Sequence, residues 1–265
     1  MHDFNYHEPS TVAEAAAIVR ASRDGRLIAG GMSLIPILKQ RRAKPSDLID
    51  LRRIGDLVGI RREAEAIVIG AMTRHIVVAE SKLLEDAIPA LARLVGEMAD
   101  PAVRNRATLG GSVAQADPAA DYPPALLALG ATIITNTRCI SADAFFTGAF
   151  IAALGKGEII TAVNFPIPEQ AAYVKFANTA SRYAIVGVFV STRGSEVRVA
   201  VTGAKTCVFR SREMEAALAK SFTPDVIKPI RVTAEGLIAD IHATREYRAH
   251  LVGLMAQRAV AAAAK

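Results

Sequence analysis

The sequence contains no tryptophan and only two cysteines, and aromatic residues make up 5% of its 265 positions. Cys139 and Cys207 lie far apart in the sequence, so they match no zinc-binding pattern. Two thiols also cannot supply the four cysteine ligands of an iron–sulfur cluster. We therefore expect two free thiols in a reducing compartment and no metal site in this chain.

Long apolar runs are also missing, although 51% of the residues are hydrophobic. Charged residues such as Asp117, Asp121 and Arg138 interrupt the most apolar region, which never reaches the roughly 20 apolar residues of a membrane-spanning helix. The first residues show neither the basic region nor the apolar core of a secretion signal. We therefore expect a cytoplasmic protein without a transmembrane segment.

The formal net charge of +6 comes from the last third of the sequence. Residues 1–170 carry 18 basic and 19 acidic groups, whereas residues 171–265 carry 14 and 7. These cations are spaced singly, without the dense basic runs and interleaved aromatic residues of a nucleic-acid surface. We therefore expect no nucleic-acid partner and assign the excess to a solvated face or to subunit contacts.

Helix and strand signals are mixed throughout, which predicts an α+β protein with a boundary at Pro166–Pro168. The predicted helices cover residues 11–21, a turn from 33, 85–98, 122–129, 211–220 and 245–263. The predicted strands cover residues 26–29, 47–50, 66–70, 132–135, 158–165, 173–177, 184–191, 196–202 and 204–209. Residues 104–118 are rich in Gly, Ser, Ala and Asp, which predicts an ordered loop.

Two double-glycine segments, Ala29–Pro36 and Thr108–Asp117, are the most informative chemical features. Paired glycines let backbone N–H groups approach a ligand, and at the start of a helix those groups favour phosphate oxygens. Two such segments suit the two phosphates of a dinucleotide. The alternative that each Gly-Gly marks an ordinary turn stays open. Neither segment is a Gly-x-Gly-x-x-Gly or Walker A motif, which disfavours a nicotinamide-type Rossmann domain and a P-loop ATPase.

The second segment continues into Asp117-Pro-Ala-Ala-Asp121. A carboxylate beside a phosphate site repels the ligand unless it accepts hydrogen bonds from neutral hydroxyls, such as those of a ribose or ribityl chain. Asp121 could also cap the helix predicted to start at Tyr122. Both roles stay open.

With these segments the sequence resembles the FAD-binding medium subunits of molybdenum hydroxylases, the family of the carbon monoxide dehydrogenase medium subunit and the xanthine dehydrogenase FAD-binding subunit. The resemblance rests on matching segments distributed over the whole chain. These are residues 29–36, 47–52, 69–73, 108–112, 117–121, 173–175 and 246–248.

The resemblance implies a two-subdomain FAD-binding fold of the vanillyl-alcohol oxidase and p-cresol methylhydroxylase type in residues 1–170, split near 55–65, and a small α+β domain in 171–265. It places non-covalent FAD between the domains and Tyr183 near the flavin ring, with a possible flavin-tuning role. The cofactor-binding residues that it implies are Ala29, Gly30, Gly31, Met32, Ser33, Leu34, Ile35, Pro36, Thr108, Leu109, Gly110, Gly111, Ser112, Asp121 and Lys175.

By the same resemblance the chain is an electron-transfer subunit that needs partners. A small subunit with 2Fe-2S clusters and a large molybdopterin-binding subunit would supply its electrons, an external acceptor would receive them, and the heterotrimer could dimerise. Two places depart from the family pattern. Met32 stands where the family often has a His, Gln or Asn, and Asn178, Thr179 and Arg182 stand before Tyr183 where a basic pair and an acidic residue are common. A stand-alone flavin oxidoreductase of the same fold and a non-catalytic assembly module are the two alternatives.

Overall fold

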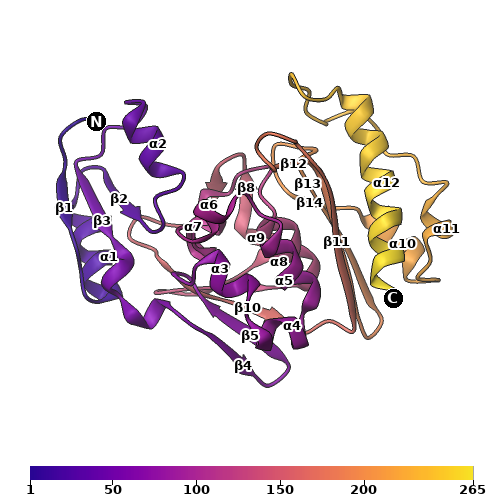
Figure 1. Cartoon of the computed structure of the whole chain (residues 1–265), viewed down its shortest axis with the longest axis horizontal. Helices are drawn as coiled ribbons and strands as arrows, with labels where there is room; N and C mark the ends of the chain where they lie inside the picture. The colour runs from indigo at the N-terminus through magenta and orange to yellow at the C-terminus, as the bar shows by residue number, and fades with distance from the viewer. Residues whose placement is uncertain (265) are drawn as a thin grey trace.

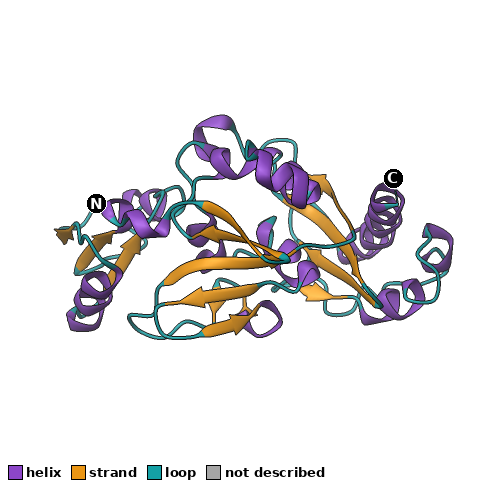
Figure 2. Ribbon diagram, turned by 90° about the horizontal axis from the view of Figure 1, so that it is seen from below, coloured by secondary structure: helices purple, strands orange, loops and turns teal. Residues whose placement is uncertain are grey.

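The computed structural model describes residues 1–264, arranged as three units side by side along the long axis of the molecule (Figure 1). We name them for their sheets: the N-terminal unit holds a three-stranded sheet, the central unit a five-stranded sheet and the C-terminal unit a four-stranded sheet. Helices cover these sheets in each unit (Figure 2). The predicted α+β class is thus confirmed.

The N-terminal unit is a small parallel sheet with strand order β1-β3-β2. Its elements are β1 (Asn5–His7), α1 (Val12–Ala21), β2 (Gly25–Ile28), α2 (Leu34–Lys39) and β3 (Asp47–Asp50), followed by short 3-10 turns at Leu51–Arg53 and Gly55–Leu57. The Thr11 side chain caps α1, because it accepts a hydrogen bond from the Glu14 amide at 3.2 Å. The capped helix buries Ala15, Ala16 and Val19 in a small apolar cluster.

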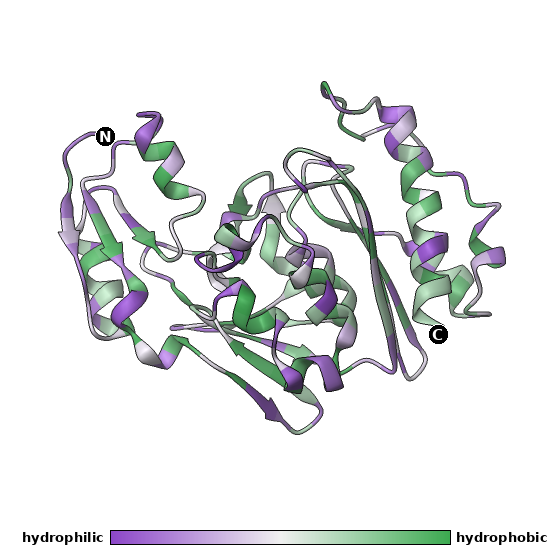
Figure 3. Ribbon diagram, viewed as in Figure 1, coloured by the Kyte–Doolittle hydropathy of each residue, from purple (hydrophilic) through white to green (hydrophobic). Residues whose placement is uncertain are grey.

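The last strand of the central unit lies in the middle of its sheet. The strands β4 (Ile60–Glu63), β5 (Ala66–Gly70), β10 (Ile160–Pro166), β6 (Thr132–Thr135) and β7 (Cys139–Ser141) stand in that order and are all antiparallel. The edge strand β4 carries charged residues on its exposed positions, whereas β5 beside it is buried, a contrast that Figure 3 shows. Charged edge strands discourage pairing with other chains.

Helices and one hairpin complete the central unit. They are α3 (His75–Ala79), α4 (Lys82–Ala87), α5 (Pro89–Gly96), α6 (Pro101–Arg104), α7 (Leu109–Gln115), α8 (Tyr122–Leu129), α9 (Ala142–Phe145), and the hairpin of β8 (Phe146–Gly148) and β9 (Ile151–Ala152). Every residue of α8 is buried. This helix is therefore the centre of the largest apolar cluster of the chain.

The C-terminal unit is an antiparallel meander covered by helices. Its elements are β11 (Gln170–Ala177), β12 (Ala184–Arg193), β13 (Glu196–Thr202), β14 (Phe209–Arg210), α10 (Arg212–Leu218), α11 (Pro224–Ile227) and α12 (Arg245–Ala263). Strand β12 is buried on both faces: Val186, Val188 and Val190 pack in the cluster with α12, and Phe189 packs in the cluster with α8. The sheet is therefore sandwiched between α12 and the central unit.

Three predicted elements differ from the structure. The helix predicted over 85–98 is two helices, because Pro89 disfavours the helical conformation at Ile88, which has φ −140° and ψ 68°. The loop predicted over 104–118 begins at the last residue of α6 and contains α7. The strand predicted over 204–209 is mostly a turn. Strands β1, β4, β7, β8 and β9 were not predicted, because each is short and lacks a clear alternating pattern.

The boundary predicted at Pro166–Pro168 falls between β10 and β11, which belong to different sheets. The division into domains at 1–170 and 171–265, with a split near 55–65, stays a prediction. None of the helices within residues 1–264 combines the length and the apolar character needed to cross a membrane.

The junction of the N-terminal and central units generates a stability prediction. A Cβ at Gly70 would overlap the carbonyl oxygen of Leu57, which already accepts a hydrogen bond from the Met72 amide at 2.8 Å. We expect Gly70→Ala to lower the free energy of unfolding by about 2 kcal/mol, as overpacking does. At Gly55 no atom of residues 1–264 outside the local backbone lies within 4 Å of the added Cβ. Gly55→Ala is therefore the matched control, and equal urea midpoints for both variants would contradict the prediction.

Candidate functional site

The first double-glycine segment connects β2 to α2. Gly31 has φ +77°, and a Cβ there would lie 2.6 Å from the Ile35 side chain, so the turn requires glycine. The turn leaves the amides of residues 30–33 without a hydrogen-bond acceptor within residues 1–264. The Ser33 side chain is exposed and does not cap α2. Unpaired N–H groups next to a free hydroxyl form a site that favours an anion.

The second double-glycine segment is the first turn of α7 and not the predicted loop. The Leu109 amide donates to the Thr73 carbonyl at 3.1 Å, and the Gly110 amide donates to the Ala71 carbonyl at 2.8 Å. A Cβ at Gly110 would lie 2.6 Å from the Ala71 side chain, so this glycine lets α7 rest on the turn after β5. Most amides of this segment are therefore used inside the protein, contrary to the expectation that both segments present free N–H groups.

The two segments nevertheless lie against each other. A Cβ at Gly30 would overlap the Arg106 carbonyl oxygen and lie 2.7 Å from the Ala107 Cα. A Cβ at Gly111 would lie 3.5 Å from the Ala29 Cβ. Figure 1 shows the loop between β2 and α2 beside α7, at the boundary of the N-terminal and central units. The free amides of the first segment therefore lie next to the second segment, and their joint use as one cofactor site stays a prediction.

The two polar residues that the resemblance adds, Asp121 and Lys175, form a buried ion pair. The Lys175 Nζ lies 2.9 Å from the Asp121 Oδ2, and the Tyr173 hydroxyl donates to Oδ1 at 2.5 Å. Burial raises the pKa of Asp121, although the Lys175 ammonium opposes the shift. The Asp121 side chain accepts no hydrogen bond from the α8 amides, so the capping role considered for it is wrong. The pair joins α8 to β11.

A row of backbone carbonyls after α5 holds three cations. The Glu97 carbonyl accepts from Lys175 Nζ at 3.3 Å, and the Met98 carbonyl accepts from Arg104 at 2.7 Å. The Ala99 carbonyl accepts from Arg104 at 2.9 Å and from Arg182 at 3.1 Å. Carbonyls at a helix C-terminus favour cations. Sequence reasoning missed this group, because backbone acceptors leave no signal in the residue types.

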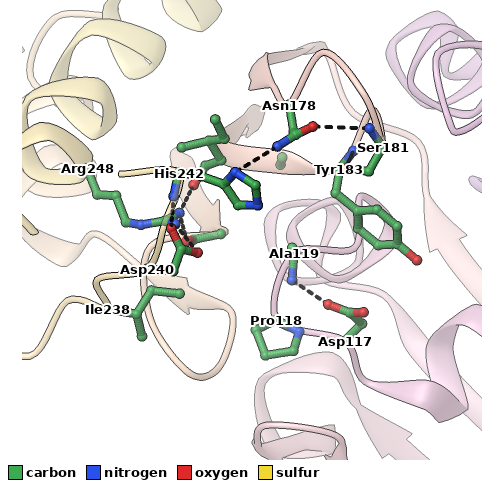
Figure 4. Close-up of a pocket in the computed structure, with 13 residues that line it drawn as sticks. Asp117, Pro118, Ala119, Asn178, Ser181, Tyr183, Ile238, Asp240, His242 and Arg248 are labelled. Carbon is green, nitrogen blue, oxygen red and sulfur yellow. Dashed lines mark hydrogen bonds and ion pairs between the residues drawn. The ribbon is translucent and has the colours of Figure 1, made fainter. Parts of the chain in front are cut away.

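Tyr183 stands at the turn between β11 and β12, next to the anchored Arg182. Its side chain is half-exposed and borders a pocket of about 220 Å³ (Figure 4). Burial raises the pKa of the Tyr183 hydroxyl, and the carboxylates of Asp117 and Asp121 raise it further. The phenol therefore stays protonated near neutral pH and lies in the field of both carboxylates. The other polar residues that border the pocket are Asp117, Asn178, Ser181, Asp240, His242 and Arg248.

His75 lies beneath the second double-glycine segment. Its amide donates to the Ala107 carbonyl at 2.9 Å, and its ring packs edge-on against Tyr122 with centroids 5.3 Å apart. The His75 side chain is buried, which lowers its pKa to about 4, and the positive charge of Arg104 adds to the shift. The imidazole is therefore neutral near pH 7. The backbone of His75 holds Ala107, the residue before the second double-glycine segment.

The depressed pKa of His75 predicts how stability depends on pH. The unfolded chain binds a proton near the ordinary pKa of 6.5, whereas the folded chain binds it only near pH 4. This contribution is therefore complete above pH 6.5 and is lost as the pH falls toward 4, at up to about 3 kcal/mol.

Urea unfolding of the wild type and of His75→Gln between pH 4 and pH 7 checks this. The loss of stability between pH 6.5 and pH 4 should be smaller in the variant, which has no imidazole to titrate. Identical pH profiles for the two proteins would contradict the assignment.

Comparison with known proteins gives similarities to one family over nearly the whole chain. Residues 2–168 match the model of the "FAD binding domain in molybdopterin dehydrogenase". The chain is 34% identical to the carbon monoxide dehydrogenase medium chain of Hydrogenophaga pseudoflava, over 98% of this chain and 96% of that protein. It is 33% identical to the 6-hydroxypseudooxynicotine dehydrogenase complex subunit alpha of Paenarthrobacter nicotinovorans, over 98% and 94%.

The solved structures give the same similarity. A chain of the reconstituted CO dehydrogenase from Oligotropha carboxidovorans superposes with a TM-score of 0.90 at 32% identity. The superposition covers 98% of this chain and 97% of that chain. The likeness therefore includes the C-terminal unit, which lies beyond the matched family model.

Proposed function

Because the chain belongs to the family of FAD-binding domains in molybdopterin dehydrogenases, we propose that it is the FAD-binding, electron-transferring subunit of such a dehydrogenase complex. Family membership confirms the resemblance inferred from the two double-glycine segments. The observation that carries the proposal is the set of free amides at residues 30–33, placed against the first turn of α7.

The residues at this site fit the diphosphate of FAD. The amides of residues 30–33 and the hydroxyls of Ser33 and Ser112 are the donors that would hold phosphate oxygens. Gly30 keeps the boundary free of a Cβ that would separate the segments, because such an atom would overlap the Arg106 carbonyl oxygen. Leu34, Ile35 and Pro36 form the first turn of α2, and the Ile35 amide donates to the Gly31 carbonyl at 3.0 Å.

The other predicted cofactor residues have roles that follow from their contacts. The charges of Asp121 and Lys175 neutralise each other. The pair would therefore be a polar neighbour of the flavin ring without a net charge. Tyr183 supplies a protonated hydroxyl and an aromatic ring on the pocket side. When bound, FAD supplies the exchange of electrons. The protein binds it, orients it and limits access of water.

Partner chains must supply the remaining redox groups. The 2Fe-2S clusters belong to a small subunit, since this sequence has two cysteines in all. We assign molybdopterin to a large subunit. Electrons then pass to an external acceptor, and the organic substrate is set by the large subunit. This agrees with relatives named for substrates as different as carbon monoxide and 6-hydroxypseudooxynicotine. We propose a cytoplasmic heterotrimer that can dimerise, with domains at 1–170 and 171–265.

A charge at Ser33 tests the phosphate site without disturbing the fold, because this side chain is exposed and makes no hydrogen bond to any other residue in the described range 1–264. We expect Ser33→Asp to lose most of its FAD, with an affinity reduced roughly tenfold by repulsion of the diphosphate. The Asn side chain has the shape of Asp but no charge, so Ser33→Asn should keep its FAD. The flavin content of the purified complex, measured by absorbance, checks both variants.

Two results would contradict the proposal. The first is a Ser33→Asp complex with the flavin content of the wild type and an unchanged melting temperature. The second is oxidation of an organic substrate by the purified chain without any partner subunit, because a dependent electron-transfer subunit has no site for that reaction.

A further inference from the structure

The two stretches of chain that contain the double-glycine segments carry basic side chains and no carboxylate. Residues 25–46 hold five basic and no acidic side chains, and residues 101–116 hold two basic and no acidic side chains. Residues 1–170 as a whole carry 18 basic and 19 acidic groups. This nearly neutral part of the chain therefore concentrates positive charge around the candidate phosphate site.

Four of these basic residues gather at the end of α2, and we call them the α2 cations. Their side chains are exposed, and none of them forms an ion pair within residues 1–264; they are Lys39, Arg41, Arg42 and Lys44. By contrast, Arg26 pairs with Asp24 at 3.0 Å. Figure 3 shows this end of α2 as a hydrophilic tip of the N-terminal unit. The tip therefore carries an uncompensated positive charge.

The backbone at the end of α2 holds one of these charges in an unfavourable conformation. The Arg41 amide donates to the Leu38 carbonyl at 3.0 Å, and the Arg42 amide donates to the Ile37 carbonyl at 3.1 Å. This pair of bonds is a Schellman motif, in which glycine usually takes the left-handed position. Arg41 takes it instead, with φ +57°. The chain therefore has a cation at a position where stability favours glycine.

The α2 cations lie at the opposite end of a short helix from the free amides of residues 30–33. Helix α2 has six residues, so its two ends are about 9 Å apart at about 1.5 Å per residue. Charges act in water over a Debye length of about 10 Å at 0.1 M salt. An anion that approaches residues 30–33 is therefore within the field of the α2 cations before it contacts the amides.

We propose that the α2 cations capture FAD electrostatically. They attract its anionic diphosphate toward the free amides of residues 30–33 and so set the rate at which the complex takes up the cofactor. Charges of one sign around a binding site accelerate the association of an oppositely charged ligand. The amides contact the bound diphosphate and set the rate of its dissociation. The inference rests on the proposed function, because the captured ligand is the cofactor assigned there.

The position of the α2 cations favours the cofactor over other anions. They follow the first double-glycine segment on the same short helix, so their field reaches the phosphate site directly. A second copy of this chain is disfavoured at this tip, because two identical positive patches repel each other. An acidic face of a partner subunit is the remaining alternative, and the experiment below separates it from cofactor capture.

Stopped-flow measurement of FAD uptake tests the inference, with the quenching of FAD fluorescence as the readout. The complex is first freed of its flavin and then mixed with FAD. The variant Lys39→Gln/Arg41→Gln/Arg42→Gln/Lys44→Gln removes the α2 cations. We expect its association rate constant to be roughly fivefold lower at about 0.1 M salt, with an unchanged dissociation rate constant. At about 1 M salt the Debye length falls to about 3 Å, so the two association rate constants should become equal.

A matched control changes the net charge by the same amount at the other end of the molecule. It is Lys220→Gln/Lys228→Gln/Arg231→Gln/Arg258→Gln, at four exposed positions of the C-terminal unit that form no ion pair within residues 1–264. Figure 1 shows α11 and α12 of that unit at the opposite end from α2. We expect the control to take up FAD at the wild-type rate.

Substitutions at Arg41 separate the charge from the shape of the turn. Arg41→Gly places the favoured residue at the left-handed position but removes one charge. We expect it to raise the melting temperature and to slow FAD uptake. Arg41→Lys keeps the charge and should keep the rate. If the turn has only a structural role, Arg41→Gly would not slow uptake, and that result would contradict the inference.

Three further results would overturn the inference. The first is the same association rate constant for the wild type and the variant without the α2 cations at about 0.1 M salt. The second is equal slowing in the matched control, which would show an effect of net charge alone. The third is loss of a partner subunit from the variant at an unchanged rate of FAD uptake, which would assign the tip to protein docking.

The proposed function is tested separately in the same measurement. A variant complex that fills with FAD at the wild-type rate refutes electrostatic capture and leaves the FAD-binding function intact. A wild-type complex that takes up no FAD would refute both.

Discussion

The close approach of Gly30 to the backbone of Arg106 and Ala107 is the constraint on which the candidate site depends. A side chain at Gly30 would separate the N-terminal unit from the central unit, and the free amides of residues 30–33 would then face no partner segment. The glycines at 31 and 110 serve the same arrangement, because Gly31 sets the turn before α2 and Gly110 seats α7 on Ala71. These glycines permit close contact between backbone segments of the protein. They affect a ligand only indirectly, through the position of those segments.

A second set of interactions joins the C-terminal unit to this site. Thr202 donates its hydroxyl to the carbonyls of Pro118 and Ala120, and the Gly203 amide donates to Pro118 as well. The buried pair of Asp121 and Lys175 adds charge to the same junction. Breaking such a pair leaves an uncompensated buried charge, which costs several kcal/mol. These contacts attach the sheet that carries the Tyr183 turn to the central unit.

The sequence was sufficient to predict the α+β class, the family and the proximity of the two double-glycine segments. Their residue types carry the signal directly. It was insufficient for the unequal roles of the segments, because the amides of Leu109 and Gly110 are satisfied by carbonyls of the turn after β5, far away in the sequence.

The basic excess of residues 171–265 was also misread in part. The cations of this region were expected mostly on a solvated face or at subunit contacts. In the structure the side chains of Arg198, Arg210 and Arg248 are largely buried, and they pair with Asp143, Glu215 and Asp240 inside the chain. Composition counts charges but does not show which of them find a partner on folding. Only the remaining exposed cations are available to other subunits.

Amide hydrogen exchange of the complex, with and without FAD, tests whether the free amides of residues 30–33 bind the cofactor. We expect FAD to slow exchange in residues 30–33, where the N–H groups have no acceptor within the described chain, and to change it little at Leu109 and Gly110, which are already hydrogen-bonded. Unchanged exchange in residues 30–33, together with FAD-dependent protection confined to another part of the chain, would contradict it.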